Sequence, residues 1–194
     1  MESYDAHPVQ NAYDEGMGQE REASDGSSTR SRRSAPTGRG RPRIPAGYGI
    51  DTTAEGLLPW SQVAERMAGS RNYWVGTTRP DGRPHAAPVW GIWLDETFYF
   101  ATDPASRKAR NLAGSPQIVV HLESGDDVVI LEGTAHAVGD LPLLARFADA
   151  YEVKYGFRPN VENAASGIYS LMPSAAYAWI EQDFPKSATR WTFS

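Results

Sequence analysis

The sequence predicts a mainly β protein, a small barrel of six or so antiparallel strands with short helices flanking its openings. Short runs rich in β-branched and aromatic residues recur along the chain and are separated by turn residues. Two tight turns, Asp81-Gly82 and Ser124-Gly125-Asp126, join neighbouring runs into hairpins. Only three stretches predict helices, so strands dominate the fold.

The predicted strands span residues 72–78, 85–94, 97–102, 117–122, 127–138, 167–181 and 188–193. The Asp-Gly dipeptide is a strong hairpin signal, so the first two strands are expected to pair directly. If the second hairpin is centred near Gly125, His121 lies opposite residue 128 or 129.

The predicted helices span residues 61–69, 106–113 and 141–155. The longest carries Leu144, Phe147, Ala148 and Tyr151 at helical spacing, which indicates one face packed against the barrel.

Residues 1–43 differ in composition from the rest of the chain. Residues 1–29 contain seven acids and one arginine, whereas residues 30–43 contain six arginines and no acid. Apolar residues are almost absent, so burial cannot offset the backbone entropy lost on ordering, roughly 1–2 kcal/mol per residue. We expect residues 1–43 to be a disordered tail and residues 44–194 to form one domain.

The composition excludes several classes of protein. The chain has no cysteine, which rules out disulfides, thiolate metal sites and cysteine nucleophiles. No apolar stretch approaches the ~18 residues that a membrane-spanning helix needs. Arg32-Arg33 is not followed by the apolar region of an export signal, so we expect a cytoplasmic protein with no membrane partner. The net charge of −5 argues against nucleic acid as a partner, and only the arginine-rich segment offers a nonspecific contact to it.

The segment 106–112 carries the strongest chemical signal. Arg107, Lys108 and Arg110 crowd the first turns of a predicted helix with no acid beside them. Cations at a helix N-terminus are unfavourable by roughly 0.3–1 kcal/mol each. Two interpretations stay open from the residues alone: an anion such as phosphate binds there, or the segment is a solvated basic face with Ser106 as N-cap.

Other familiar motifs are absent or misplaced. Gly38-Arg39-Gly40 follows no predicted strand and opens no helix, so it is not a dinucleotide fingerprint. The sequence contains no phosphate-binding loop that ends in Gly-Lys-Ser/Thr and no Gly-x-Ser-x-Gly elbow. His121 and His136 are not cross-strand neighbours in the predicted register, so no metal site is expected.

Several segments together resemble the pyridoxamine 5′-phosphate oxidase-like superfamily, the flavin split barrels. Residues 73–90 resemble its first hairpin, residues 98–112 with Ser115-Pro116 its phosphate-binding strand and helix, and residues 129–134 its next barrel strand. Residues 183–193 are similar to the C-terminus of the actinobacterial branch that uses the deazaflavin coenzyme F420 in place of FMN. The resemblance covers about residues 57–193.

The resemblance implies a split-barrel homodimer with two equivalent cofactor sites at the subunit interface. Carried over by position, Arg107 and Lys108 hold the cofactor phosphate, and the hydroxyl groups of Thr102 and Ser106 add hydrogen bonds. The backbone of Pro88, Val89, Trp90 and Gly91 lies along the cofactor ring, where small residues permit close approach. Arg190 and Trp191 either reach toward this site or simply close the barrel, with Trp191 in the core and Arg190 on the surface.

One departure bears on the cofactor. Val128 stands where the FMN-using oxidases place a glutamine near the ring, and the C-terminal segment 190–193 matches only part of their substrate-recognition pattern. These differences favour F420 and leave FMN as the alternative. The sequence thus predicts an oxidoreductase that transfers a hydride between this cofactor and a small unsaturated substrate, with no catalytic side chain assigned. A non-catalytic flavin- or F420-binding carrier, or an adaptor that acts through the arginine-rich tail, are the other hypotheses.

Overall fold

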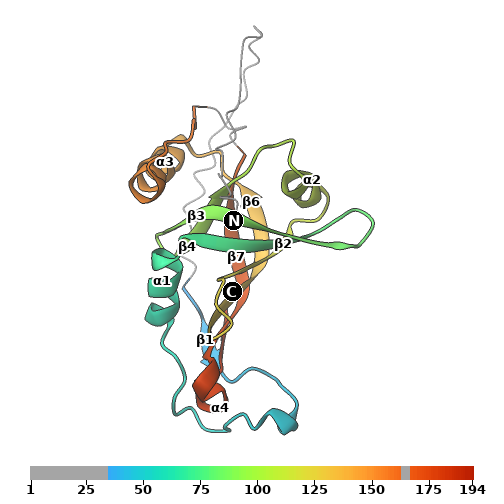
Figure 1. Ribbon diagram of the computed structural model, residues 1–194, viewed down its shortest axis with the longest axis vertical. Helices are drawn as coiled ribbons and strands as arrows, with labels where there is room; N and C mark the ends of the chain where they lie inside the picture. The colour runs from blue at the N-terminus through green and yellow to red at the C-terminus, as the bar shows by residue number, and fades with distance from the viewer. Residues whose placement is uncertain (1–34, 163–166) are drawn as a thin grey trace, which may run out of the picture. The chain divides into compact units, whose positions relative to one another are not determined.

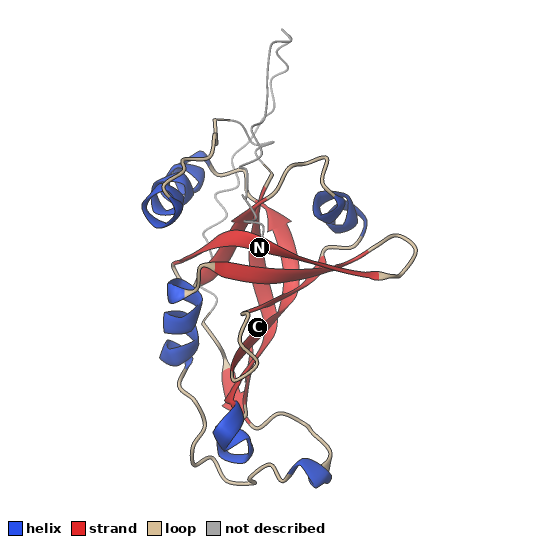
Figure 2. Ribbon diagram, viewed as in Figure 1, coloured by secondary structure: helices blue, strands red, loops and turns tan. Residues whose placement is uncertain are grey.

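The computed structural model describes residues 35–162 and 167–194, and the strands of this part of the chain form one antiparallel sheet (Figures 1 and 2). The strand order is β1-β8-β7-β4-β3-β2-β5-β6. Because β7 also pairs with β6, the six strands from β2 to β7 close into a barrel, and β8 and β1 extend it from β7. The predicted barrel class is confirmed.

Each of the seven predicted strands is present with both ends within one residue of its expected position. The strands are β1 Gly38–Gly40, β2 Asn72–Thr78, β3 Pro84–Leu94, β4 Thr97–Ala101, β5 Gln117–His121, β6 Asp127–Ala137, β7 Ile168–Ile180 and β8 Thr189–Thr192. Only β1 was not expected.

The three predicted helices are also present, as α1 Trp60–Gly69, α2 Arg107–Gly114 and α3 Leu141–Tyr155. A short α4 Phe184–Ser187 and two 3₁₀ turns, η1 Ala46–Tyr48 and η2 Glu181–Asp183, were not expected. The N-cap of α3 is Asp140, whose carboxylate accepts a hydrogen bond from Leu143 N at 3.0 Å, and its C-cap is Gly156, whose φ of 71° suits glycine.

The main core cluster lies inside the barrel and receives side chains from all six barrel strands and from β8. α1 adds Val63 and Met67, both fully buried, on its side that faces the barrel. A second cluster lies outside the barrel, where α3 covers Ile92 of β3 and Tyr99 of β4 with Phe147 and Tyr151. Figure 1 shows α3 above one end of the β2–β3 pair and α2 above the other, with the hairpin tip extending past α2.

The long strand β7 joins the barrel to its extension. Its first residues pair with β4 and its later residues with β8, while β6 pairs along the other edge. The β6–β7 register shifts between Glu132 and Gly133, and a Cβ at Gly133 would lie 2.0 Å from the carbonyl oxygen of Met172. Only glycine allows this close approach of the two strands.

The predicted boundary of the tail differs from the structure. Gly38–Gly40, inside the predicted tail, forms β1 and pairs with β8. The Arg41 guanidinium donates hydrogen bonds to the carbonyl oxygens of Thr53 at 2.9 Å and Ala188 at 3.1 Å. A strand of this composition is held through its backbone, which composition does not reveal. Residues 1–34 of the predicted tail lie outside the described residues.

The predicted partner of His121 is wrong by one or two positions, because His121 pairs with Ile130 rather than with residue 128 or 129. The Oγ of Ser124 accepts a hydrogen bond from Asp127 N at 3.0 Å and organises a wider turn than the sequence suggested. Within the described part of the chain, no helix is long and apolar enough to cross a membrane.

Candidate functional site

The first part of the candidate site is the turn between β4 and α2. Ser106 is the N-cap of α2, because its Oγ accepts a hydrogen bond from Ala109 N at 3.1 Å. The Oγ1 of Thr102 lies 2.9 Å from the same oxygen. One hydroxyl proton is used between Thr102 and Ser106, so the proton of the other hydroxyl is left to donate to a ligand.

Arg107 and Lys108 occupy the first turn of α2, which contains no acid. Backbone N–H groups at the first helical positions have no acceptor within the helix, and the Ser106 hydroxyl satisfies only that of Ala109, which leaves those of Arg107 and Lys108. Arg107 is exposed, whereas Lys108 is partly buried, and burial lowers the pKa of its ammonium group. Free amides, two cations and a hydroxyl proton at one turn suit a phosphate.

The second part of the candidate site is β3, which passes the same turn. The ladder ends with Gly91 opposite Phe100, and Thr102 follows two residues later, just past the end of β4. The predicted phosphate-binding turn and the predicted ring-binding segment therefore both continue from the same end of the β3–β4 ladder.

The side chains of that segment divide between the two faces of the sheet. Pro88 and Trp90 are exposed, and Trp90 retains 38% of its accessible surface, whereas Val89 and Gly91 are buried. A Cβ at Gly91 would lie 2.4 Å from the ring of Phe98. The small size of Gly91 therefore serves the packing of Phe98 inside the barrel, while Pro88 and Trp90 present the apolar outer surface.

Trp90 is held by α3. Its ring stacks on Tyr155, with the centroids 4.7 Å apart and the planes inclined by 3°. The Tyr155 Oη accepts a hydrogen bond from Gly91 N at 3.0 Å and lies 2.7 Å from the carbonyl oxygen of Arg71, to which it can donate. The guanidinium carbon of Arg71 lies 5.5 Å from the Trp90 ring centre. This end of the segment is thus pre-organised by contacts within the chain.

Arg190 and Trp191 have different environments. Trp191 is 1% exposed and packs edge-on against Trp60, with ring centroids 5.6 Å apart. Arg190 points to the outer face of β8, where its Nε lies 3.4 Å from the Oη of Tyr177. Trp191 therefore belongs to the barrel core, and Arg190 is the member of this pair with surface to offer a ligand.

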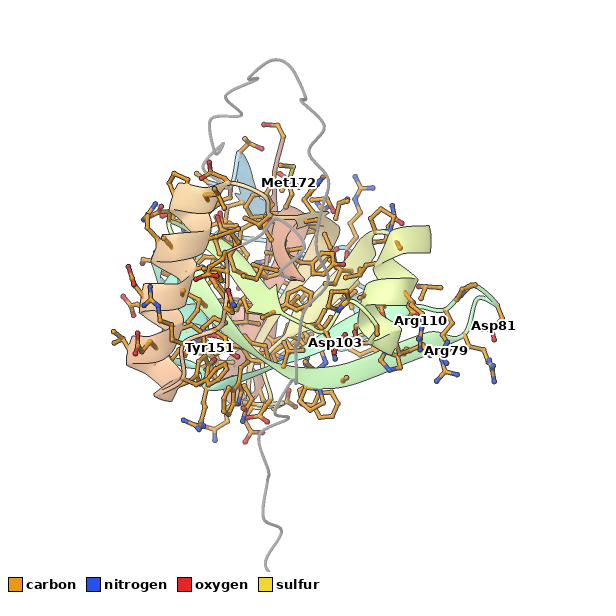
Figure 3. The ribbon with its side chains drawn as sticks, turned by 90° about the horizontal axis from the view of Figure 1, so that it is seen from above. Arg79, Asp81, Asp103, Arg110, Tyr151 and Met172 are labelled. Atoms are coloured by element: carbon orange, nitrogen blue, oxygen red, sulfur yellow. The ribbon has the colours of Figure 1, made fainter. Side chains whose placement is uncertain are left out.

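Sequence reasoning missed two residues near α2, Arg79 and His85 of the β2–β3 hairpin. Burial lowers the pKa of His85, and the positive charges of Arg79, Lys108 and Arg107 lower it further. Figure 3 shows Arg79 where the hairpin passes α2, with Asp81 at the hairpin tip. The pairing of the hairpin predicted from Asp81-Gly82 was the available signal, because it places residues 79 and 85 at the same end of the two strands.

A polar chain links α2 to this hairpin. The Asn111 side chain donates a hydrogen bond to Thr77 Oγ1 at 2.9 Å, and the same oxygen lies 3.4 Å from Nδ1 of His85. Lys108 and Asn111 are three residues apart and share one face of α2. The face of α2 that carries Lys108 is therefore turned toward Thr77 and His85.

The comparisons with known proteins identify the family. The sequence profile of the pyridoxamine 5′-phosphate oxidase family matches residues 60–182, well over half of the chain. The chain belongs to this family. The match to the pyridoxamine 5′-phosphate oxidase family begins with α1 and ends after β7, so it includes the closed barrel, the turn before α2 and β3, and leaves Arg190 and Trp191 outside.

Solved structures support the same fold. A conserved hypothetical protein, Rv2991 from Mycobacterium tuberculosis, is similar with a TM-score of 0.59 and 23% identity, over 69% of this chain and 91% of that one. The General Stress Protein 26 from Bacillus anthracis is similar with a TM-score of 0.51 and 25% identity, over 61% and 91%. A heme binding protein from Mycobacterium smegmatis has a TM-score of 0.50 and 17% identity, over 63% and 55%. No curated protein sequence matches the chain.

Pyridoxamine 5′-phosphate oxidase-like proteins form a flavin-binding superfamily, and the residues of this member fit such a group. The start of α2 offers amides, the cations of Arg107 and Lys108 and one hydroxyl proton to a phosphate. Pro88 and Trp90 on β3 leave some apolar surface exposed to a ring, while Tyr155 covers one face of the Trp90 indole. The start of α2 and residues 88 and 90 are separated in sequence, and the direct pairing of β3 with β4 connects them.

Proposed function

We propose that this protein is a cytoplasmic, homodimeric oxidoreductase that transfers a hydride between a flavin-type cofactor and a small, planar, unsaturated substrate. F420 is the preferred cofactor and FMN the alternative. The single observation that carries the proposal is the arrangement at the start of α2, where the partly buried Lys108 lies beside two free backbone amides. The chain belongs to a flavin-binding superfamily, in which a phosphate is the expected anion. The unpaired amides together with two cations at one turn favour a bound anion over a solvated basic face.

The preference for F420 depends on Val128 and the C-terminal segment. Val128 is 8% exposed and has no side-chain donor, although FMN-using oxidases carry a glutamine at the matching position. A ring that needs no side-chain hydrogen bond there suits this site better. FMN stays the alternative because the phosphate-binding groups do not distinguish the two cofactors.

When bound, the cofactor supplies the hydride chemistry itself. Arg107 and Lys108 hold its phosphate through charge-assisted hydrogen bonds, and the free hydroxyl proton of Thr102 or Ser106 adds one donor. Pro88 and Trp90 cover one face of the ring and exclude water from it. The chain's contribution is thus binding and orientation, and no acid–base side chain is assigned.

A partly exposed apolar strip supports the homodimer. On the outer face of the barrel, Trp74 stacks on His121, with ring centroids 6.4 Å apart, and Val119 keeps 36% of its surface exposed. Ile130, opposite His121, extends the strip onto β6. A second copy of the chain would bury these side chains.

Native mass spectrometry of the full chain, purified from a host that makes both F420 and FMN, tests the proposal. We expect a dimer of two 21.3-kDa chains that carries F420. A dimer that carries FMN alone would select the alternative cofactor. A chain that binds neither cofactor would refute the proposal, and bound cofactor with no turnover of any quinone, enone or tetrapyrrole would favour the non-catalytic carrier.

A further inference from the structure

The cations around the start of α2 come from two separate parts of the chain. α2 supplies Arg107 and Lys108, and the β2–β3 hairpin supplies Arg79 and His85, which we call the hairpin wall. The charges of Arg79, Lys108 and Arg107 all act on His85. The start of α2 is therefore only one side of a cationic cluster.

The guanidinium group of Arg79 has one donor, Nε, without an acceptor. Its Nε is buried and has no hydrogen-bond partner among the described residues. The carboxylate of the hairpin, Asp81, is engaged by Arg83 at 2.6 Å. Since buried polar groups are almost always hydrogen-bonded, a buried guanidinium donor without a partner indicates a ligand acceptor.

His85 is placed so that both of its protonation states can be satisfied. When the imidazole is neutral, the Thr77 hydroxyl can donate to Nδ1 across 3.4 Å. When the imidazole is protonated, Nδ1 donates to Thr77 Oγ1, which still accepts from Asn111, and the hydroxyl proton turns to the carbonyl oxygen of His85, 3.5 Å away. The network therefore accommodates a proton on His85 without moving a heavy atom.

We infer that Arg79 and His85, the hairpin wall, form the second side of the anion site, and that His85 takes up a proton from solvent when a negatively charged phosphate or sulfate group binds there. This inference rests on the anion site of the proposed function and extends it. The only bond formed is the N–H bond to the proton that solvent supplies, and the bound anion supplies the negative charge that compensates the imidazolium.

The direction of the linkage follows from the surrounding charges. The groups that act on His85 are Arg79 from its own hairpin and Arg107 and Lys108 from α2, and β2 contributes only the uncharged Thr77. Burial and these charges hold the pKa of His85 below its ordinary value of about 6.5. An anion cancels the positive field, so the pKa of His85 rises on binding and the anion binds more tightly as the pH falls.

The test is a pH titration of the His85 ring by NMR in the full chain, with sulfate as the probe, because sulfate keeps its charge across the titration. His85 is assigned with His85→Gln, and sodium chloride at equal ionic strength is the control. We expect saturating sulfate to raise the pKa of His85 by about one unit, which corresponds to about tenfold tighter binding at low pH than at high pH. The rings of His121 and His136 should not respond.

Two arginine variants in the β2–β3 hairpin, one predicted to matter and one control, make the test more specific. Arg79→Gln should weaken sulfate binding at least severalfold, whereas Arg83→Gln, whose charge Asp81 already engages, should leave it unchanged. In His85→Gln the sulfate affinity should lose its dependence on pH. Equal effects of the two arginine variants would contradict the inference.

The outcomes separate this inference from the proposed function. Sulfate could shift the amide signals of Arg107 and Lys108 and leave the pKa of His85 unchanged. That result would contradict the role of the hairpin wall and leave the cofactor proposal intact. Sulfate could also raise the pKa of His85 in a protein that binds neither F420 nor FMN. That result would support the role of the hairpin wall and refute the proposed cofactor. The absence of any sulfate effect would overturn the inference.

Discussion

Gly91 illustrates how the structure changes the interpretation of a single residue. From the sequence, its small size predicted close approach of a cofactor ring. In the structure the space beside Gly91 is occupied by the ring of Phe98, and its amide and carbonyl are held by Tyr155. Which neighbour uses the space beside a glycine depends on tertiary packing, and the sequence alone does not contain that information.

Gly91→Ala should destabilise the protein by about 1–3 kcal/mol, because the new methyl group meets a buried ring and a backbone oxygen. Its Cβ would lie 2.4 Å from Phe98 and 2.9 Å from the carbonyl oxygen of Tyr99. Gly76→Ala on β2 is the matched control, since its Cβ would make an ordinary contact with Val119 at 3.6 Å. Urea unfolding of both variants measures the difference, and equal stabilities would contradict the packing argument.

At the scale of elements, the sequence predicted what apolar periodicity and turn residues control. The α3 helix and β2 have the predicted bounds, because each alternates buried and exposed residues at its own period. β1 escaped prediction, since Gly38–Gly40 joins the sheet through backbone hydrogen bonds alone. The hairpin register at His121 also escaped it, because the Ser124 side chain shapes the turn.

Arg41 fastens the segment after β1 to the C-terminal part of the chain. Its guanidinium donates to the carbonyl oxygens of Thr53, Glu55, Lys186 and Ala188. Arg41→Ala should lower the free energy of unfolding by about 1 kcal/mol, because the partly buried hydrogen bond to Ala188 and three exposed ones lose their charged donor. The exposed Arg43→Ala is the control. Thermal unfolding that is the same for both variants would show that the segment contributes nothing to the domain.

Lys154 of α3 makes the stability depend on pH. Its ammonium donates to Tyr73 Oη at 2.8 Å and to the carbonyl oxygens of Gly91 and Ala68 at 3.3 Å. Burial lowers its pKa to about 8, against about 10.4 in an unfolded chain. The unfolded state then binds more protons between these values, so the free energy of unfolding should rise with pH from about 8 upward.

Denaturant unfolding of the wild type and Lys154→Met at about pH 7.5 and pH 9.5 measures this effect. Lys154→Met should lack the rise. The same pH profile in both proteins would contradict it. The raised pKa of Tyr73 and Tyr151 affects stability only above about pH 10, outside this window.

At the scale of the whole molecule, the site divides into a part that sequence could reveal and a part that it could not. The segment 106–112 allowed the proposed phosphate end to be predicted, because capping and charge act within one turn of helix. The hairpin wall of Arg79 and His85 depends on a contact between segments far apart in sequence. The position of Trp191 could not be decided from the sequence for the same reason, because only its packing against Trp60 shows that it lies in the core.

Val119→Lys should convert the dimer to monomers, because it places a charge next to His121 on the outer face of the barrel that the proposed interface buries. Val119 points outward from β5, so the monomer should keep its fold. Val153→Lys on α3, where the valine is 89% exposed, is the control and should remain dimeric. Light scattering at micromolar concentration gives the masses. A wild-type monomer, or a dimer that survives Val119→Lys, would show that the strip is not the interface.

Cofactor titration of the wild type and Lys108→Ala tests the central claim, that the start of α2 binds the phosphate of a flavin-type cofactor. F420 and FMN are titrated in parallel against the wild type, Lys108→Ala, Arg107→Ala and the control Arg110→Ala. A charge-assisted hydrogen bond is worth about 1.5–3 kcal/mol. Lys108→Ala and Arg107→Ala should therefore each bind the cofactor about ten- to hundredfold more weakly, and Arg110→Ala should bind it as the wild type does. Unchanged affinity in both Lys108→Ala and Arg107→Ala, or slight stabilisation of the fold without loss of binding, would contradict the claim.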